Sequence, residues 1–391
     1  MKKLGLIWRI VIAIVLAIVL GTVLPMVGFG IDRVFGRVFA TFNVVFGQFL
    51  GFVVPLIIIG FITPSIAKLG KGSGKLLGIA TAVAYTSTVL AGIFAFLVAS
   101  NLLPHFISSA DKEVSVEGAR EALSTFIDIE LPPVMGIMTA LLLAFLLGIG
   151  MAAIKGDVMS RLFDELNEIV EKTISVAIIP LLPFHIFGIF YNMTYTGEVG
   201  RVLTVFAMVF VMIIILHWIM LAIQYTTAGS MAKKSPLFLL KTMAPAYFTA
   251  LGTQSSAATI PVTLRQAKKT GASEKITDFT IPLFATIHLS GSTITIVSTS
   301  IGVMLMYGMD VAMGSFVPFI FMLGVAMIAA PGVPGGAIVA ASGFLVSMLG
   351  FDQEMVALMV ALYLAQDSFG TATNVTGDGA LSVIVDSLSK K

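Results

Sequence analysis

Apolar runs of about twenty residues recur along the chain, a length that lets a helix cross the ~30 Å hydrocarbon core of a bilayer. This recurrence constrains the fold more than any other feature of the sequence. The alternating pattern of about ten residues that is typical of outer-membrane strands is absent. Hydrophobic residues make up 58% and charged residues 11% of the 391 positions, which is more apolar than a soluble core requires. The sequence therefore predicts an all-α integral membrane protein.

The hydropathy pattern predicts eight transmembrane helices. The fifth includes an amphipathic stretch, 155–172, and an acidic loop follows the third. The first six spans cover about 6–27, 39–66, 76–103, 134–154, 175–191 and 202–225. The denser basic loops lie on one side, which the positive-inside rule makes cytoplasmic. We therefore expect a multi-pass protein of the cell inner (plasma) membrane, with both termini cytoplasmic.

The second half of the chain contains interrupted apolar segments. Residues 243–264 are broken by small hydroxylated residues, and residues 316–349 are broken by two prolines and three glycines, which a continuous helix does not accommodate. Both segments predict re-entrant helical hairpins. Between them the seventh span, 276–306, is interrupted at 286–292. Unwound backbone at membrane depth is tolerated only where it lines a cavity or is buried in protein.

This order of hairpin, broken span, hairpin and polar span predicts inverted repeats, the pattern of a secondary transporter with substrate at the midplane. The first half of the chain has few intramembrane polar groups and is interpreted as scaffold. The predicted division assigns 1–75 to scaffold spans 1 and 2 and 76–103 to span 3 of the transport domain. It assigns 104–235 to an extracellular loop and spans 4–6, with span 6 in the transport domain, and 236–391 to the transport core.

The last span, about 355–385, carries a polar stripe. Helical spacing places Asp367, Thr371, Asn374 and Asp378 on one face. Each ionisable residue costs at least ~2.5 kcal/mol inside a bilayer, so it remains only if something pairs with it. The stripe predicts a binding site for cations and ammonium groups. The alternative is a polar helix–helix contact, which does not require two intramembrane acids.

Four motifs in the second half resemble one transporter family. They are Ser255-Ser256 with Thr259-Ile260-Pro261-Val262-Thr263, Ala285-Thr286-Ile287, Gly332-Val333-Pro334-Gly335, and Asn374-Val375-Thr376-Gly377-Asp378. The chain resembles the dicarboxylate/amino acid:cation symporter family, which includes glutamate and neutral amino acid transporters. Gln366-Asp367-Ser368 is similar to the serine/threonine:sodium symporters. The resemblance implies a homotrimer with a static scaffold and a transport domain that moves as an elevator.

The resemblance also implies the residues of a substrate site. Ser256 and main-chain N–H groups of the second hairpin would hold a carboxylate, which agrees with the preference of helix N-termini for anions. Asp367 would pair with the substrate ammonium, and Thr371 would add a hydrogen bond. The full predicted substrate-binding set is Ser255, Ser256, Ser292, Val333, Gly335, Asp367, Gly370, Thr371 and Asn374.

Two sodium sites are implied in the same way. The Asp378 carboxylate would serve one, and main-chain carbonyls would serve the other. The predicted cation-binding set is Phe284, Thr286, His288, Met327, Ile328, Ala330, Asn374 and Asp378. Ser290 stands where acidic amino acid carriers have an acid, so we expect fewer coupled sodium ions. His288 permits either proton coupling or a fixed hydrogen bond. The remaining histidines, His105, His185 and His217, are interpreted as loop or packing residues.

The substrate is predicted to be a small neutral amino acid such as serine, threonine or alanine. Gly370 and Gln254 occupy the two positions where acidic carriers of the family have an arginine. A distal carboxylate would therefore be buried unpaired, at a cost of several kcal/mol. The predicted function is a sodium-coupled symporter. The alternatives are a proton-coupled or mixed carrier of another small zwitterion or carboxylate, and an ion channel, which the occluding hairpins disfavour.

Other function classes are disfavoured by composition and motifs. No metal-ligand cluster or nucleophile–base pair indicates an enzyme, and no cofactor is expected. The net charge of +2 does not indicate nucleic-acid binding. Membrane lipid and the transported amino acid are the expected partners.

Overall fold

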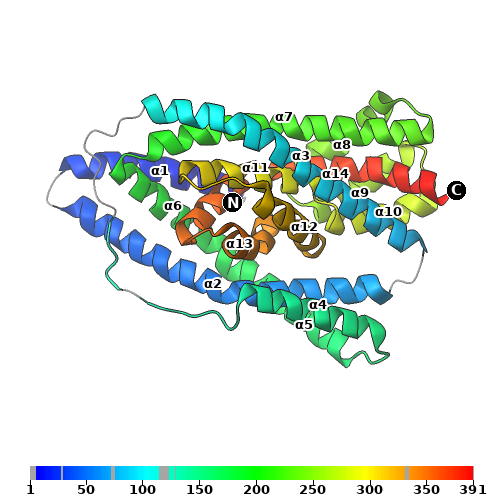
Figure 1. Cartoon of the computed structure of the whole chain (residues 1–391), viewed down its shortest axis with the longest axis horizontal. Helices are drawn as coiled ribbons and strands as arrows, with labels where there is room; N and C mark the ends of the chain where they lie inside the picture. The colour runs from blue at the N-terminus through cyan, green and yellow to red at the C-terminus, as the bar shows by residue number, and fades with distance from the viewer. Residues whose placement is uncertain are drawn as a thin grey trace, which may run out of the picture.

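A computed structural model of the chain describes residues 6–27, 30–71, 75–113, 123–127, 129–330 and 334–390, and all regular structure within these ranges is helical (Figure 1). The helices are α1 (Leu6–Val27), α2 (Ile31–Lys71), α3 (Lys75–Glu113), α4 (Ile137–Ala153), α5 (Val158–Thr173), the π-helical turn η1 (Ile174–Ile178), α6 (Ile179–Thr196), α7 (Val199–Ala232), α8 (Pro236–Thr253), α9 (Ser256–Lys269), α10 (Glu274–Ile287), α11 (Ser290–Met306), α12 (Met313–Ala329), α13 (Gly336–Leu349) and α14 (Gln353–Ser389).

In the described part of the chain, seven helical segments are long and apolar enough to cross a membrane. These seven segments correspond to predicted spans 1–3 and 5–8, and the fourth predicted span is not among them. That span is α4, an apolar helix of 17 residues, about 25 Å long at 1.5 Å per residue. The prediction of eight membrane-spanning helices is therefore confirmed for seven, and the fourth is a shorter apolar helix.

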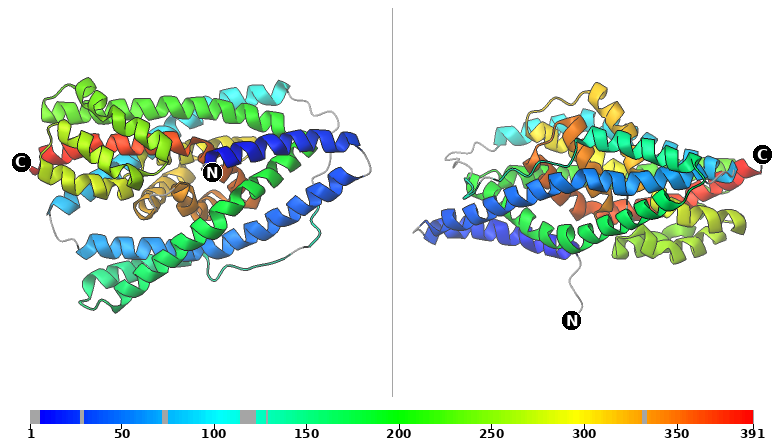
Figure 2. Two further views of the ribbon diagram at one scale, coloured as in Figure 1. Left: turned by 180° about the vertical axis from the view of Figure 1, so that it is seen from behind. Right: turned by 90° about the horizontal axis from the view of Figure 1, so that it is seen from below.

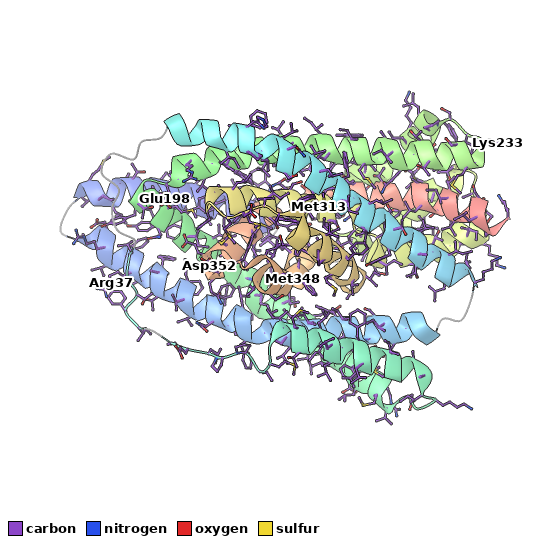
Figure 3. All side chains as sticks on the ribbon, viewed as in Figure 1. Arg37, Glu198, Lys233, Met313, Met348 and Asp352 are labelled. Atoms are coloured by element: carbon purple, nitrogen blue, oxygen red, sulfur yellow. The ribbon has the colours of Figure 1, made fainter. Side chains whose placement is uncertain are left out.

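Several helices extend beyond the predicted bounds because hydropathy marks only the part of a helix that lies in hydrocarbon. α2 has 41 residues and α3 has 39. The amphipathic stretch forms α5, which η1 joins to α6, so this stretch extends the fifth span as predicted. Figure 3 shows Lys233 at one end of the molecule and Arg37 and Glu198 at the other, so these charged side chains flank the apolar middle.

The helices fall into two groups by their contacts. In the first, α2 contacts α4, α5 and α6, and α1 contacts α6. In the second, α14 contacts α7, α8, α10 and α11, and α3 contacts α7, α11 and α12. Figure 1 shows α2, α4 and α5 along one edge and α3 and α7 along the other, with α14 between the edges. Figure 2 shows the same arrangement from two further sides.

Helix breaks occur where the sequence predicts them. The first hairpin turns between α8 and α9 at Gln254, whose φ of 54° is left-handed, and at Ser255, the N-cap of α9. The seventh span breaks between α10 and α11 at His288 and Leu289. In the second hairpin, α12 ends at Ala329 and α13 begins at Gly336.

The hairpin helices fold back on each other: α8 contacts α9, and α12 contacts α13. α9, α12 and α13 have 14, 17 and 14 residues, which is about 21–26 Å at 1.5 Å per residue. These lengths are below the ~30 Å of the hydrocarbon core. α9 and α13 are therefore shorter than a membrane-spanning helix requires, in contrast to the 37-residue, unbroken α14.

Candidate functional site

The polar stripe of α14 lies in the interior of the protein. The exposed fractions of Asp367, Thr371, Asn374 and Asp378 are 4%, 5%, 2% and 1%. Their neighbours are α7, α10, α11 and α13, which α14 contacts along its length. The interrupted elements therefore meet at one buried polar helix, and the stripe predicted from helical spacing faces them.

Asn374 caps a helix that belongs to another part of the chain. Its Oδ1 accepts hydrogen bonds from the main-chain N–H groups of Gly291 (2.7 Å) and Ser292 (3.3 Å), in the first turn of α11. Its Nδ2 donates to Ser292 Oγ at 3.0 Å, and the Tyr363 hydroxyl donates to the same oxygen at 2.9 Å. The first N–H groups of a helix have no partner within that helix. Asn374 and Ser292 are thus brought together, and both are engaged in holding the start of α11.

α11 and α14 approach backbone to backbone beside this cap. A Cβ placed on Gly291 would lie 2.5 Å from the Gly370 carbonyl oxygen, which is closer than real Cβ atoms approach any atom. A Cβ on Gly370 would lie 3.5 Å from the main-chain nitrogen of Ser292, an ordinary contact. Gly370, predicted to line the substrate pocket, therefore lies against the α11 backbone.

His288 and Asp378 form a buried pair. His288 Nδ1 lies 2.8 Å from Asp378 Oδ1, and the exposed fractions of the two side chains are 0% and 1%. A carboxylate can only accept, so an ionised Asp378 receives the Nδ1–H of the imidazole. This pairing joins the break between α10 and α11 to α14.

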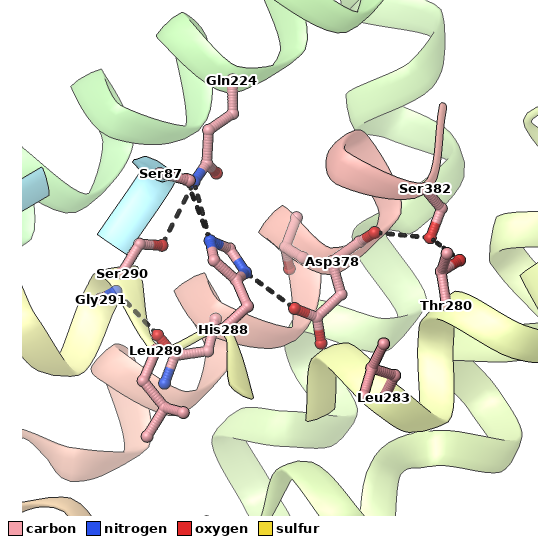
Figure 4. A network of polar contacts seen from close by, with 12 residues as sticks. Ser87, Gln224, Thr280, Leu283, His288, Leu289, Ser290, Gly291, Asp378 and Ser382 are labelled. Carbon is pink, nitrogen blue, oxygen red and sulfur yellow. Dashed lines mark hydrogen bonds and ion pairs between the residues drawn. The ribbon is translucent and has the colours of Figure 1, made fainter. Parts of the chain in front are cut away.

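The other ring nitrogen of His288 faces a second polar cluster, drawn in Figure 4. His288 Nε2 lies 3.1 Å from Ser87 Oγ of α3. The Gln224 amide of α7 donates to Ser87 Oγ at 3.0 Å and to Ser290 Oγ at 3.2 Å. Side chains of α3, α7 and α14 therefore meet at one imidazole ring.

One oxygen of Asp378 remains open. Oδ2 is buried and has no hydrogen-bond partner among the described residues, and in Figure 4 it lies on the side of Leu283, away from His288. An unsatisfied buried acceptor costs about 1–3 kcal/mol, and more when it is charged. A cation bound at Oδ2 would remove this cost. The arrangement therefore fits the predicted role of Asp378 as a cation ligand.

The C-terminus of α12 lies close to the C-terminus of α10. Ile328 of α12 packs in one apolar cluster with Phe284 and Ile287 of α10. The last carbonyls of a helix have no partner within it and carry the negative end of the helix dipole. The Thr286 hydroxyl donates to the Leu283 carbonyl at 2.8 Å, within the last turn of α10. The predicted carbonyl ligands Thr286, Met327, Ile328 and Ala330 all belong to these two ends.

Asp367 binds the start of the second hairpin's returning helix. Its Oδ2 accepts a hydrogen bond from the Gly335 N–H at 2.7 Å, and the Thr371 hydroxyl donates to Oδ1 at 3.4 Å. Gly335 is the N-cap of α13 and has a φ of 76°. The structure therefore brings Asp367, Gly335 and Thr371 together, whereas Val333 lies outside the described residues.

The first hairpin contributes the N-terminus of α9. The Ser255 hydroxyl accepts a hydrogen bond from the Ala258 N–H at 3.2 Å and so acts as the N-cap. Ser256 is the first residue of α9 and is buried, with 7% of its surface exposed. Because α9 packs against α14, the positive end of the α9 dipole lies in the same group of helices as the stripe.

Two polar residues of α7 make contacts that the sequence did not predict. His217 is buried, in keeping with its interpretation as a packing residue, and its Nε2 also hydrogen-bonds the Gly291 carbonyl oxygen at the start of α11 across 3.0 Å. Gln224, described above, was not singled out. The available signal was their spacing of seven residues within an apolar span, which places both on one helix face.

Breaks in three helical segments, gathered around one buried acidic helix, define a polytopic membrane protein whose polar site lies between helix ends. Such sites are typical of secondary transporters. Residues 6–388 match the Sodium:dicarboxylate symporter family, and the chain belongs to this family. Because this is a family of transporters, the prediction that the chain is not an enzyme is confirmed.

Curated relatives carry the names of amino acid transporters. The chain is 28% identical to Excitatory amino acid transporter 1 of Rattus norvegicus over 241 residues, which are 60% of this chain and 44% of the relative. It is 35% identical to Excitatory amino acid transporter 3 of Mus musculus over 160 residues, covering 41% and 30% of the two chains. With Excitatory amino acid transporter 4 of Mus musculus the identity is 26% over 303 residues, covering 73% and 53%. The chain thus spans about half or less of the length of these relatives.

Proposed function

We propose that this chain is a secondary carrier that takes up a small neutral amino acid, such as serine, threonine or alanine, together with sodium. The observation that carries the proposal is the buried Asp378 carboxylate, one oxygen of which has no donor among the described residues. A charged group at this depth is stable only when it is neutralised. Membership in the Sodium:dicarboxylate symporter family supports sodium as the neutralising cation.

The preference for a neutral substrate is supported by the absence of a nearby cation. Within the described ranges, no lysine or arginine forms an ion pair with Asp367. Gly370 and Gln254 stand where a guanidinium would balance a second carboxylate. An acidic side chain would therefore add an unpaired charge, which costs several kcal/mol. A small polar or methyl side chain carries no such cost.

In this proposal the site residues have the roles that the sequence predicts for them. Asp367 takes the substrate ammonium, and the N-termini of α9 and α13 take its carboxylate. The proposed cation ligands are the Asp378 carboxylate and the carbonyl groups at the ends of α10 and α12. The imidazole of His288 fills the space between Ser87 and Asp378, which supports fewer coupled cations than in acidic amino acid carriers.

We extend the proposal to the assembly and its motion. The contact group of α1, α2, α4, α5 and α6 is the scaffold, and the group around α14 moves as an elevator within a homotrimer in the plasma membrane. Large apolar side chains on α4, including Leu142 and Leu146, are 68% and 70% exposed, as expected of a face that meets lipid or a neighbouring subunit. The mass of the purified protein in detergent, corrected for bound detergent, tests the trimer.

Uptake of radiolabelled serine into proteoliposomes tests the function. An inward sodium gradient should drive accumulation, and replacing sodium by choline should abolish it. If a pH gradient drives accumulation without sodium, the coupled ion is the proton and not sodium. Currents far above carrier turnover would indicate a channel. No uptake of serine, threonine or alanine under any gradient would contradict the proposal.

A further inference from the structure

The predicted partners of the two ends of the substrate are bonded to each other in this structure. The Asp367 carboxylate is 4% exposed and accepts the Gly335 N–H at 2.7 Å. The Thr371 hydroxyl, at 3.4 Å, reaches its other oxygen. Asp367 belongs to α14, and Gly335 belongs to the second hairpin. This hydrogen bond therefore connects the hairpin to the polar stripe.

The Gly335 N–H is positioned to donate a hydrogen bond to a carboxylate. Gly335 is the N-cap of α13, and carboxylates are stabilised at the positive end of a helix dipole. The backbone is held closely against α14, because a Cβ on Gly335 would lie 2.8 Å from Leu364 Cδ2. Hydrogen bonds from N–H groups to carboxylates are about twice as strong as those between neutral groups. The ligand of this donor in the structure is the protein's own carboxylate.

We propose that the Asp367–Gly335 hydrogen bond is an internal substitute for a zwitterionic substrate, an inference that rests on the proposed function. The substrate carboxylate displaces Asp367 from the Gly335 N–H, and the released Asp367 accepts the substrate ammonium. One internal hydrogen bond is exchanged for two contacts to the ligand. Without substrate, the same bond holds the returning helix of the hairpin against α14.

This exchange selects the class of ligand. A ligand with adjacent ammonium and carboxylate groups satisfies both partners. A simple carboxylate would take the Gly335 N–H and leave Asp367 buried beside a second negative charge, with no described cation to balance it. A simple amine would leave the internal bond in place and gain nothing from the hairpin. Recognition of the two ends of the ligand is therefore coupled, and α-amino acids are accepted where monocarboxylates of the same size are rejected.

Thiol labelling of the substrate-free protein tests the internal bond. The chain contains no cysteine, so Ala337→Cys provides a single reporter in the first turn of α13, where the native side chain is 4% exposed. In this background, Asp367→Ala should raise the rate of maleimide labelling at least tenfold. Asp367→Asn keeps an acceptor oxygen for the Gly335 N–H, so its labelling rate should stay within about threefold of the background, as a neutral hydrogen bond still forms.

The matched control is Asp386→Ala. This aspartate lies on the same helix but pairs with Ser273 and Lys390 near its end, so labelling should be unchanged. Equal labelling rates in the background and in Asp367→Ala would overturn the proposal. Because this measurement uses no substrate, it is decided independently of the proposed function.

A second measurement uses the unmodified protein and a matched set of probes: L-alanine, propionate and ethylamine. Ligands that bind the folded state raise its thermal stability. L-alanine should raise the Tm in sodium, while propionate and ethylamine at the same concentration should not. Stabilisation by propionate comparable to that by alanine would refute the coupling. Failure of all three probes would count against the proposed function, and the labelling result would still decide whether the internal bond exists. Asp367→Asn should label slowly yet lose the alanine shift, which separates the two roles of this residue.

Discussion

Asp378→Asn is the substitution that most directly tests the cation site. Asparagine has nearly the same shape as aspartate, and its Oδ1 can still accept the His288 Nδ1–H across the present 2.8 Å. The oxygen that now has no donor, Oδ2, is replaced by an amide NH₂ group. The substitution therefore keeps the helix packing and removes the negative charge and the open acceptor.

The expected loss follows from two opposing effects. At an effective dielectric constant of about 20, a unit charge pair about 4 Å apart gains about 4 kcal/mol, and direct coordination gains more. The buried carboxylate has already lost several kcal/mol of hydration, and its removal recovers part of that cost. We expect a net loss of about 3 kcal/mol of sodium binding free energy, which raises the sodium dissociation constant on the order of 100-fold.

The assay is the thermal stability of the purified protein across a sodium series, with choline as the replacement cation, because a bound ligand stabilises by mass action. Asp386→Asn is the matched control. It removes a carboxylate of the same helix that pairs with Lys390 at 2.6 Å and is not near the site, so its sodium midpoint should equal that of the wild type. A folded Asp378→Asn protein with the wild-type sodium midpoint would refute the assignment of Asp378 as a cation ligand.

Substitutions at three further positions test the packing around the site, and one at a fourth position serves as a surface reference. Gly335→Ala places a side chain at a φ of 76°, which costs about 1–2 kcal/mol, so the Tm should fall and the alanine-induced shift should shrink. Gly291→Ala forces apart two backbones that leave only 2.5 Å for a Cβ. We expect a loss of about 1–3 kcal/mol, and an unchanged Tm would contradict the close approach. Gln224→Leu removes the amide that donates to two hydroxyls and should cost about 1–2 kcal/mol, whereas Gln224→Glu, which retains acceptors only, should not restore the Tm. Asp278→Asn breaks a half-exposed ion pair with Lys268 at 2.8 Å, and because exposed pairs contribute less than about 1 kcal/mol, its Tm should match the wild type within roughly 2 °C.

The helix breaks were predictable because their causes are local. Proline removes a backbone donor, and glycine tolerates left-handed backbone, so the second hairpin turn is visible in the residues that form it. The stripe on α14 was predictable for a related reason. Side chains three and four residues apart share a helix face whatever surrounds the helix, so the four polar residues had to lie together.

Contacts across the structure were not predictable in the same way. Asn374 was expected to contact the substrate, but it caps α11, whose first turn lies more than eighty residues earlier in the chain. His217 and Gln224 lie in an ordinary apolar span, and their partners are supplied by α3 and by the first turn of α11. The rotation and depth of each helix decide such pairs, and these are fixed by side-chain packing between helices.

The sequence by itself determined that this chain is helical, where its helices break, and which face of the last helix is polar, because these depend on hydropathy, backbone geometry and helical period. Only the tertiary structure decided the partner of each polar group. It placed His288 against Asp378, leaving one carboxylate oxygen open, and Gly335 against Asp367. The physical reason is that a buried polar group takes whichever donor or acceptor the packing of distant helices brings within about 3 Å, and no local pattern encodes that distance.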